Sequence, residues 1–316
     1  MVSPAPDRGL DLTGRRAVIF GAAGQDGYYL SQLCRELGIE TVCVSRSSGD
    51  VIGDVADFDL VGSVIERTRP DWVFHLAALS TTAASGALEN HAAISTGSLN
   101  VLEATSRHCP EARVFITGSG LQLANRGRPI AASDDFDPSS PYAVSRIHSV
   151  YTARYYRARG IRAYVGYLFH HESPRRGKTH VARLVSSAAA RSARGSREPL
   201  LIGSLDVRKE WTFAGDVVRG IWTLVNQDEV FEAAIGSGTP HSIGEFVAAC
   251  FDAVGLRWQD HVRTKDAFSP EYSLLVSDPS VIRALGWQTQ VGLEALAKMM
   301  VEADLAALDG AAEPLW

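Results

Sequence analysis

Three glycines near the N-terminus have the spacing of a loop that holds a dinucleotide. Gly21, Gly24 and Gly27 lie in the run GAAGQDG, which follows a short apolar run and opens a helix-like one. Glycine permits a tight turn and a close approach of the backbone to a pyrophosphate, and the N-terminus of the next helix faces the negative charge. A plain turn before a helix has the same composition, so the strand-loop-helix context is what favours a cofactor site.

The residues at the end of the next apolar run determine whether such a site prefers NAD or NADP. A carboxylate there would bind the ribose 2′-hydroxyl of NAD, whereas an arginine accommodates the 2′-phosphate of NADP. This chain has Ser45-Arg46-Ser47-Ser48 and no carboxylate before Asp50. We therefore expect NADP, with NAD still open because Arg46 also fits an ordinary surface charge.

The elements that position these residues alternate along the chain. Strands separated by helices favour a parallel sheet with right-handed crossovers, a doubly wound Rossmann fold of the α/β class. We expect a flexible tail at 1–14, a dinucleotide-binding domain at 15–168 with return segments near 205–236, and a smaller, mostly C-terminal substrate-binding lobe at 169–204 and 237–316. The predicted strands are 17–20, 41–44, 72–76 and 114–117, and the predicted helices are 28–37, 57–68, one ending near His108, 181–194 and 243–254.

The composition is that of an ordinary globular protein. The chain has 316 residues, 46% of them hydrophobic, and a net charge of -5, which gives no general attraction to nucleic acid or to an anionic membrane. The four cysteines form no CxxC pair, so we expect no metal site and a reduced cytoplasmic location. The stretch from Arg175 to Arg197 is locally basic, which fits either a solvated helix face or a cradle for a diphosphate.

Several longer motifs resemble one family. The GxxGxxG loop is similar to that of the extended short-chain dehydrogenase/reductases, and the resemblance narrows to GDP-mannose 4,6-dehydratases. It covers about residues 15 to 305. The matching segments are GQDGYYL at 24–30 followed by RSS at 46–48, LFHHESPRRG at 168–177, GSLD at 203–206 with Glu210, Trp211 and Asp216, and LGW at 285–287.

The resemblance implies a set of ligand contacts. The substrate would be a nucleotide-linked sugar, most plausibly a GDP-sugar, with His170 and Lys209 among the residues that bind it. The family also implies a homo-oligomer, and because the loop at 47–53 is short we expect a dimer rather than a tetramer. The residues implied to contact NADP are Gly21, Gly24, Gln25, Asp26, Gly27, Arg46, Asp54, Val55, Leu76, Ala77, Ala78, Tyr142, Arg146, His171 and Arg176.

A tyrosine and an arginine stand where the family has its Tyr-x-x-x-Lys pair. Tyr142 and Arg146 are four residues apart, so they share one face of a helix that Ser140 and Pro141 begin well. The resemblance implies that Tyr142 accepts the proton of the sugar C4 hydroxyl as hydride leaves for the nicotinamide. Arg146 keeps the positive charge of the family's lysine on a bulkier planar group.

Two further positions depart from the family. Gly118 stands where the family has a catalytic Thr or Ser, and Gly120 stands where it has the glutamate that moves a proton from C5 during dehydration. Thr117 and Ser119 flank Gly118, but an ideal strand turns their side chains to the opposite face. Because the strand ends here, we expect Ser119 to replace the missing hydroxyl. His170, where the family has asparagine, is either a substitute acid or base or a structural histidine.

Three hypotheses follow from this altered set. The first is an NADP-dependent nucleotide-sugar enzyme of the 4,6-dehydratase type, which begins with hydride transfer from C4. The second is a GDP-sugar C4 epimerase or oxidoreductase without dehydration, for which the loss of the glutamate matters less. The third is a non-catalytic homologue that kept the cofactor and lost the chemistry.

Overall fold

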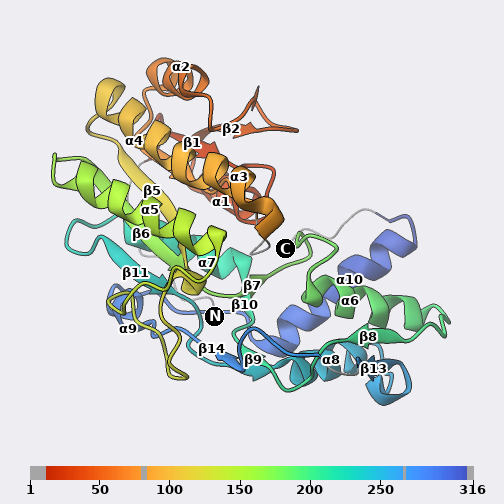
Figure 1. Cartoon of the computed structure of the whole chain (residues 1–316). Helices are drawn as coiled ribbons and strands as arrows, with labels where there is room; N and C mark the ends of the chain where they lie inside the picture. Colours follow the sequence, from red (N-terminus) through yellow and green to blue (C-terminus); the bar gives the residue numbers. More distant parts are fainter. Residues whose placement is uncertain (1–11, 80–83, 266–267, 312–316) are drawn as a thin grey trace.

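A parallel sheet of seven strands forms the centre of the larger lobe in the computed structural model, which describes residues 12–79, 84–265 and 268–311 (Figure 1). The strand order is β11-β6-β5-β4-β1-β2-β3. The chain therefore runs outward from β1 in one direction and returns beside β1 with β4, which places a crevice for a ligand at the carboxyl ends of these two strands. The strands are β1 (Arg16–Phe20), β2 (Glu40–Ser45), β3 (Val51–Ile52), β4 (Trp72–His75), β5 (Arg113–Ser119), β6 (Arg162–Leu168) and β11 (Glu232–Ile235).

Helices cover both faces of this sheet. Successive side chains of a strand point to opposite faces, so Ile19 packs in a cluster with α1 and α7, while Val18 and Phe20 pack with α2, α4 and α5. These two layers confirm the doubly wound α/β fold. The helices are α1 (Gln25–Glu36), α2 (Phe58–Thr68), α4 (Gly97–His108), α5 (Pro141–Arg157) and α7 (Ala214–Val225).

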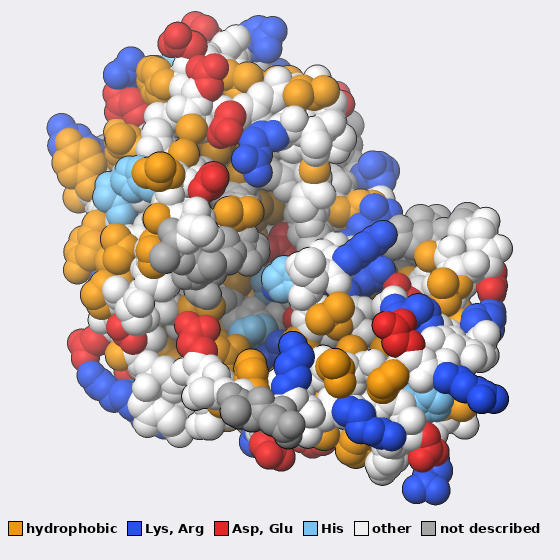
Figure 2. Space-filling model, turned by 45° about the vertical axis from the view of Figure 1, so that its right-hand side comes forward, with side chains coloured by type: hydrophobic (Ala, Val, Ile, Leu, Met, Phe, Trp, Pro, Cys, Tyr) orange, Lys and Arg blue, Asp and Glu red, His pale blue; other side chains and the backbone are white. Residues whose placement is uncertain are grey.

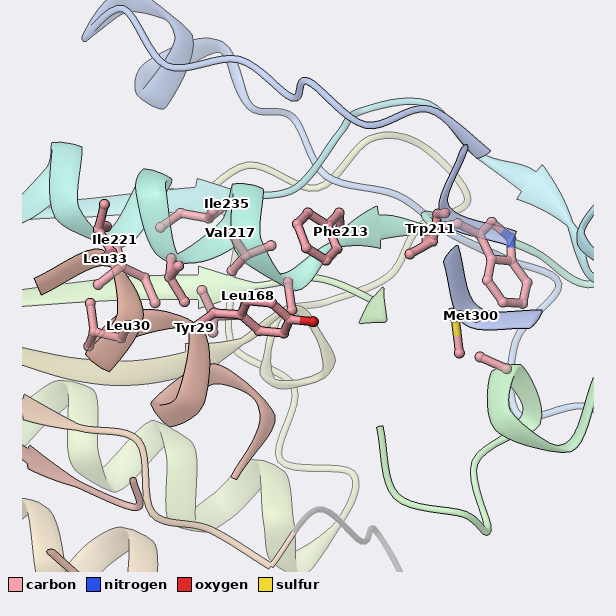
Figure 3. Close-up of a cluster of buried hydrophobic side chains, with 14 of the residues drawn as sticks. Tyr29, Leu30, Leu33, Leu168, Trp211, Phe213, Val217, Ile221, Ile235 and Met300 are labelled. Atoms are coloured by element: carbon pink, nitrogen blue, oxygen red, sulfur yellow. The ribbon is translucent and has the colours of Figure 1, made fainter. Parts of the chain in front are cut away.

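A smaller lobe is built from three mutually packed helices, α6 (Val181–Ala193), α8 (Ile243–Asp252) and α10 (Leu293–Leu308), at the right of Figure 1. Its core is continuous with that of the larger lobe: the cluster in Figure 3 runs from Leu30 and Leu33 of α1 past Phe213 to Trp211 and Met300. The remaining elements are β7 (His171–Glu172), β8 (Leu200–Ile202), β9 (Arg208–Lys209), β10 (Thr212–Phe213), β12 (His241–Ser242), β13 (Val262–Thr264), β14 (Leu274–Leu275), α3 (Ala87–Asn90), α9 (Ser280–Ala284), the 3₁₀ turns Ala84–Gly86, Gly120–Gln122 and Trp258–Asp260, and the π-helical turn His91–Thr96.

The structure adds elements that the sequence patterns did not predict. β3, β6 and β11 were not predicted, and α1 begins at Gln25 rather than at 28 because the glycine loop leads directly into it. The domain boundaries stay a prediction, although α7 and β11 do return to the large sheet while β9 pairs with β12 and β14. Residues 1–11 of the predicted tail lie outside the described residues. None of the helices in the described part of the chain is long and apolar enough to cross a membrane.

Candidate active site

The glycine loop lines a cavity of about 300 Å³, called here the first cavity, at the carboxyl ends of β1, β2 and β4. Gly21 has a φ of 92°, and a Cβ on it would lie 2.6 Å from the backbone nitrogen of Ala77. A Cβ on Gly27 would lie 2.5 Å from the carbonyl oxygen of Gly21. Both positions therefore require glycine, and the tight cradle that results fits a pyrophosphate. The predicted cofactor residues that line the cavity are Gly21, Gly24, Gln25, Asp26, Gly27, Arg46, Asp54, Val55, Leu76, Ala77, Ala78 and Arg176.

The segment that contains His171 and Ser173 forms hydrogen bonds with the start of α1. His171 Nε2 lies 2.8 Å from Asp26 Oδ1, and the Ser173 hydroxyl donates a 2.7 Å hydrogen bond to Gln25 Oε1. Burial raises the pKa of Asp26, but the charge and hydrogen bond of His171, together with the charge of Arg176 and a hydrogen bond from Gln25, hold that pKa below its ordinary value. Burial lowers the pKa of His171, and the Asp26 carboxylate raises it above its ordinary value. The two side chains thus form an ion pair at the base of the cofactor loop.

A third contact continues this attachment. The guanidinium carbon of Arg175 lies 3.8 Å from the ring centroid of Tyr28, one turn further along α1. Cations over tyrosine rings at this distance attract the ring electrostatically. Residues 171–175, which we call the latch, therefore contact α1 at three successive points.

A second cavity of about 350 Å³ adjoins the first and holds the predicted catalytic residues. Asp26, Leu76, Ala78 and Arg176 line both cavities, so the two are contiguous. Figure 2 shows this face hollowed between the two lobes, with histidine side chains at the hollow. The predicted residues brought together here are Ser119, Tyr142, Arg146, His170 and His171.

Tyr142 and Arg146 meet as the helical spacing predicts. Ser140 caps α5 by accepting a hydrogen bond from the backbone nitrogen of Ala143, which fixes the start of the helix. Arg146 Nε donates to the Tyr142 hydroxyl at 3.2 Å, and Arg146 Nη1 donates to the carbonyl oxygen of Thr117 at 2.5 Å. Arg146 is only 4% exposed, so its charge acts on the phenol with little screening by water.

The two glycine positions have little space for the family's side chains. A Cβ on Gly118 would lie 3.0 Å from the ring of Tyr167, and one on Gly120 would lie 2.7 Å from the ring of Phe169. The Phe169 ring therefore fills the place from which a side chain at 120 would reach the cavity. Ser119 caps the 3₁₀ turn that follows β5, since its Oγ accepts a hydrogen bond from the Leu121 nitrogen, yet it still lines the second cavity.

His170 follows β6 and makes a polar contact with Tyr272. His170 Nε2 is 3.2 Å from the Tyr272 hydroxyl. Burial, together with the charges of Lys209 and Arg176, holds the pKa of His170 well below its ordinary value. The imidazole is therefore neutral near pH 7, able to donate from one nitrogen and accept at the other.

Lys209, predicted to bind substrate, does not line either cavity among the described residues. Its ammonium is buried 3.9 Å from Glu172 Oε1 and lies over the Trp211 ring. Burial lowers the pKa of Lys209 to about 8. Lys209 thus lies outside the lining of the two cavities, and its charge helps to lower the pKa of His170. Its role in substrate binding stays a prediction.

Several residues of the second cavity were not predicted as site residues. Phe169 lies inside the LFHHESPRRG segment and His180 lies three residues after it, so a fuller reading of that region would have included both. Glu271 and Tyr272 come from the loop before β14, about a hundred residues further along the chain, and no local spacing signals them. Only the packing of the two lobes brings this loop to the cavity.

Comparisons with known proteins identify the family. The family described as GDP-mannose 4,6 dehydratase matches residues 18–300. GDP-mannose 4,6 dehydratase 1 of Arabidopsis thaliana is 33% identical to this chain, and the match covers 92% of this chain and 89% of the relative. GDP-mannose 4,6-dehydratase of Sinorhizobium fredii is 30% identical over 95% of this chain and 99% of its own length.

Solved structures share the fold at lower identity. RMD from Pseudomonas aeruginosa, solved with NADPH, has a TM-score of 0.82 and 20% identity over 93% of this chain and 99% of that one. UDP-glucose 4-epimerase of Thermus thermophilus, solved with NAD, has a TM-score of 0.78 and 20% identity over 92% of this chain and 98% of that one. The resemblance inferred from the motifs is confirmed, and the chain belongs to the GDP-mannose 4,6-dehydratase family.

Proposed function

We propose that this protein is an NADP-dependent enzyme that oxidises a GDP-linked sugar at C4, with Tyr142 as the proton acceptor. The observation that carries the proposal is the 3.2 Å hydrogen bond from Arg146 Nε to the Tyr142 hydroxyl, in a cavity contiguous with the glycine cradle. The names of the curated relatives support a GDP-sugar. The solved neighbours hold NAD or NADPH, and Arg46 in the first cavity supports NADP.

The residues divide the work of such a step. A bound nicotinamide supplies the hydride acceptor. Tyr142 accepts the proton of the C4 hydroxyl, and the fixed charge of Arg146 stabilises the anion that forms on the phenol and the one that develops on the sugar oxygen. Ser119, at the carboxyl end of β5, supplies a hydroxyl beside Gly118, where the family's Thr or Ser is missing.

A second candidate reaction is C4 oxidation and re-reduction without loss of water. It is favoured by Gly120, where the family's glutamate is absent and the Phe169 ring occupies the space. A 4-keto sugar that turns over in its site and is reduced on the other face gives the C4 epimer, and this requires only Tyr142 and the cofactor. The titratable side chains of this cavity include His170 and Glu271, and neither stands on β5.

Product mass separates the two reactions. The purified protein is incubated with NADP and a series of GDP-sugars, and the products are separated by chromatography and weighed by mass spectrometry. A product of unchanged mass and altered retention supports oxidation and re-reduction at C4 without dehydration. A product lighter by one water supports the dehydratase and overturns the second candidate. If no sugar is altered while the cofactor binds, the proposed activity fails.

A homo-oligomer, with a dimer favoured over a tetramer, is part of the same proposal. It rests on the family resemblance and on the short loop between Ser47 and Gly53. Light scattering at micromolar concentration tests it directly. A mass of one chain would contradict it.

A further inference from the structure

The turn that follows β5 presents no polar side chain to the second cavity at the place where the resemblance puts proton transfer from C5. Gly120 has no side chain, and Leu121 lines the cavity with an apolar one. Gln122 is fully buried, and its Oε1 accepts a 2.8 Å hydrogen bond from the Ser119 nitrogen. Its amide therefore completes the turn and is not among the groups that line the cavity.

An aromatic ring takes this position instead. β5 and β6 pair so that Ser119 lies beside Leu168, and Phe169 therefore follows next to Gly120. A Cβ on Gly120 would lie 2.7 Å from the Phe169 ring. The ring is 3% exposed and belongs to the core cluster on the α2, α4 and α5 side of the sheet, so packing keeps it at this place. Further apolar residues that line the cavity are Leu76, Leu121, Leu168 and Leu275.

The carboxylates of the second cavity come from other parts of the chain. Among its described lining residues only Asp26 and Glu271 are acidic. Asp26, at the start of α1, is paired with His171 at 2.8 Å, and Glu271 is an exposed residue of the loop before β14. The end of β5 thus brings Ser119 together with the Phe169 ring and supplies no carboxylate of its own.

The Phe169 ring has a consequence for the sugar carbon that lies nearest to it. In a hexose, C6 is joined to C4 through C5 alone, so a sugar with C4 at Ser119 and Tyr142 has C6 within reach of the neighbouring residues. The resemblance puts the family's glutamate, here Gly120, against C5 and C6. A hydroxymethyl group buried against the Phe169 ring would lose its hydrogen bonds to water, whereas a methyl group packs there without that cost.

We propose that the second cavity takes a GDP-linked 4-keto-6-deoxy sugar, which the protein reduces at C4 with NADPH, and that Phe169 selects the methyl group at C6. This rests on the proposed function, run in the reductive direction. The carbonyl carbon receives a hydride from the reduced nicotinamide, and Tyr142 donates its phenolic proton to the carbonyl oxygen. The ketone becomes an alcohol, the nicotinamide is oxidised, and Tyr142 recovers its proton from water.

This substrate has to come from another enzyme. A 4-keto-6-deoxy sugar is formed from a hexose by the loss of one water, and that loss needs a base at C5, which the end of β5 does not supply. A separate 4,6-dehydration must therefore precede the step catalysed here, and this protein consumes its product.

Two ligands that differ only at C6 test the selection without any turnover. GDP-6-deoxymannose and GDP-mannose are titrated calorimetrically into the protein saturated with NADPH, a mixture in which neither alcohol can be oxidised. We expect the Kd of GDP-6-deoxymannose to be lower by about 10- to 100-fold, since an apolar pocket rejects an added hydroxyl by at most about 10²-fold.

A matched pair of variants assigns the selection to the ring. Phe169→Leu keeps the surface apolar and should keep most of the ratio between the two Kd values. Phe169→His keeps a flat ring but adds polar nitrogens that can bind a hydroxyl, so the ratio should fall towards one. Because two ligands are compared on the same protein, a general loss of stability does not imitate this result. An unchanged ratio in Phe169→His would show that Phe169 does not face C6.

Reduction is measured directly with GDP-4-keto-6-deoxymannose as the probe. With NADPH, the native protein should lower the absorbance of the reduced nicotinamide and give a product heavier by two hydrogens. Equal affinity of the native protein for the two alcohols, or loss of water from GDP-mannose, would overturn the inference.

The failure of the inference is distinguishable from that of the proposed function. If GDP-mannose is oxidised at C4 while the 4-keto probe is left unchanged, only the inference fails. If neither sugar nucleotide is altered while the cofactor binds, the proposed function itself fails.

Discussion

The first and second cavities adjoin, yet they are built in different ways. The first is shaped by backbone: Gly21 and Gly27 are required because main-chain atoms of Ala77, Ala22 and Gly21 itself leave no space for a Cβ. The second is shaped by side chains from several distant segments, such as the Phe169 ring beside Gly120. A site made of backbone changes only if the fold changes, whereas a site made of side chains is altered by single substitutions. The motif resemblance predicts departures from the family at Gly118, Gly120 and Arg146, all on the side-chain-built cavity, in line with this difference.

The largest expected effect is on turnover, after substitution of Tyr142, the proposed proton acceptor in the second cavity. Tyr142→Phe removes the proton acceptor and keeps the ring, so turnover should fall by about 10²-fold or more while the Kd of the cofactor stays unchanged. The rate of product formation, followed by chromatography and mass spectrometry, with calorimetric titration of NADP, measures both. Intact turnover in Tyr142→Phe would place the catalytic group elsewhere, with His170 the next to test.

A matched pair of glycine variants tests the contrast between backbone and side-chain walls. Gly27→Ala drives a methyl group into main-chain atoms, so it should cost about 3 kcal/mol in the free energy of unfolding and weaken cofactor binding severely. Gly120→Ala meets only the Phe169 ring, which can rotate, and should cost about 1 kcal/mol. Denaturant titration of both variants decides. Equal losses would refute the distinction drawn between the two cavities.

The third prediction changes the cofactor side by one side chain. Arg46→Asp replaces the cation at the end of β2 with a carboxylate that binds a ribose 2′-hydroxyl and repels a 2′-phosphate. The ratio of the Kd values for NADP and NAD should reverse, with a change of about tenfold or more. Arg35→Asp, on α1, is a control with the same charge change outside the lining of the first cavity. Tighter binding of NAD than of NADP to the native protein would contradict the prediction at once.

The smallest effect is a pH dependence at the latch. The raised pKa of His171 stabilises the fold fully below its ordinary value of about 6.5, and this is lost as pH rises through the raised value. The lowered pKa of Asp26 stabilises it above about 3.9, and this is lost as pH falls. The pair therefore acts between these limits, so His171→Gln should lose about 1 kcal/mol more at about pH 5.5 than at about pH 8.5. A loss independent of pH in denaturant titrations would argue for an uncharged hydrogen bond.

The same contrast governs what the sequence could predict. The glycine loop and the helical pair Tyr142 and Arg146 were found because local spacing determines where backbone and neighbouring turns lie. β6 was missed because Gly166 interrupts its apolar run. That glycine is explained by the packing of the Phe115 ring, which would lie 2.8 Å from a Cβ there, and of Ile235, at 3.0 Å. The Tyr272 contact with His170 depends on how the lobes pack, which no spacing along the chain reveals.

The latch has a consequence for how this protein can be recombined with its relatives. Its three contacts with α1 join residues that are about 145 positions apart in the chain, as in the pair His171 and Asp26. A chimaera that takes the N-terminal half from one relative and the 168–177 segment from another inherits the two sides of this attachment from different parents. We expect chimaeras to fold stably only when residues 25–28 and 171–175 come from the same parent. These two short stretches should therefore be exchanged together.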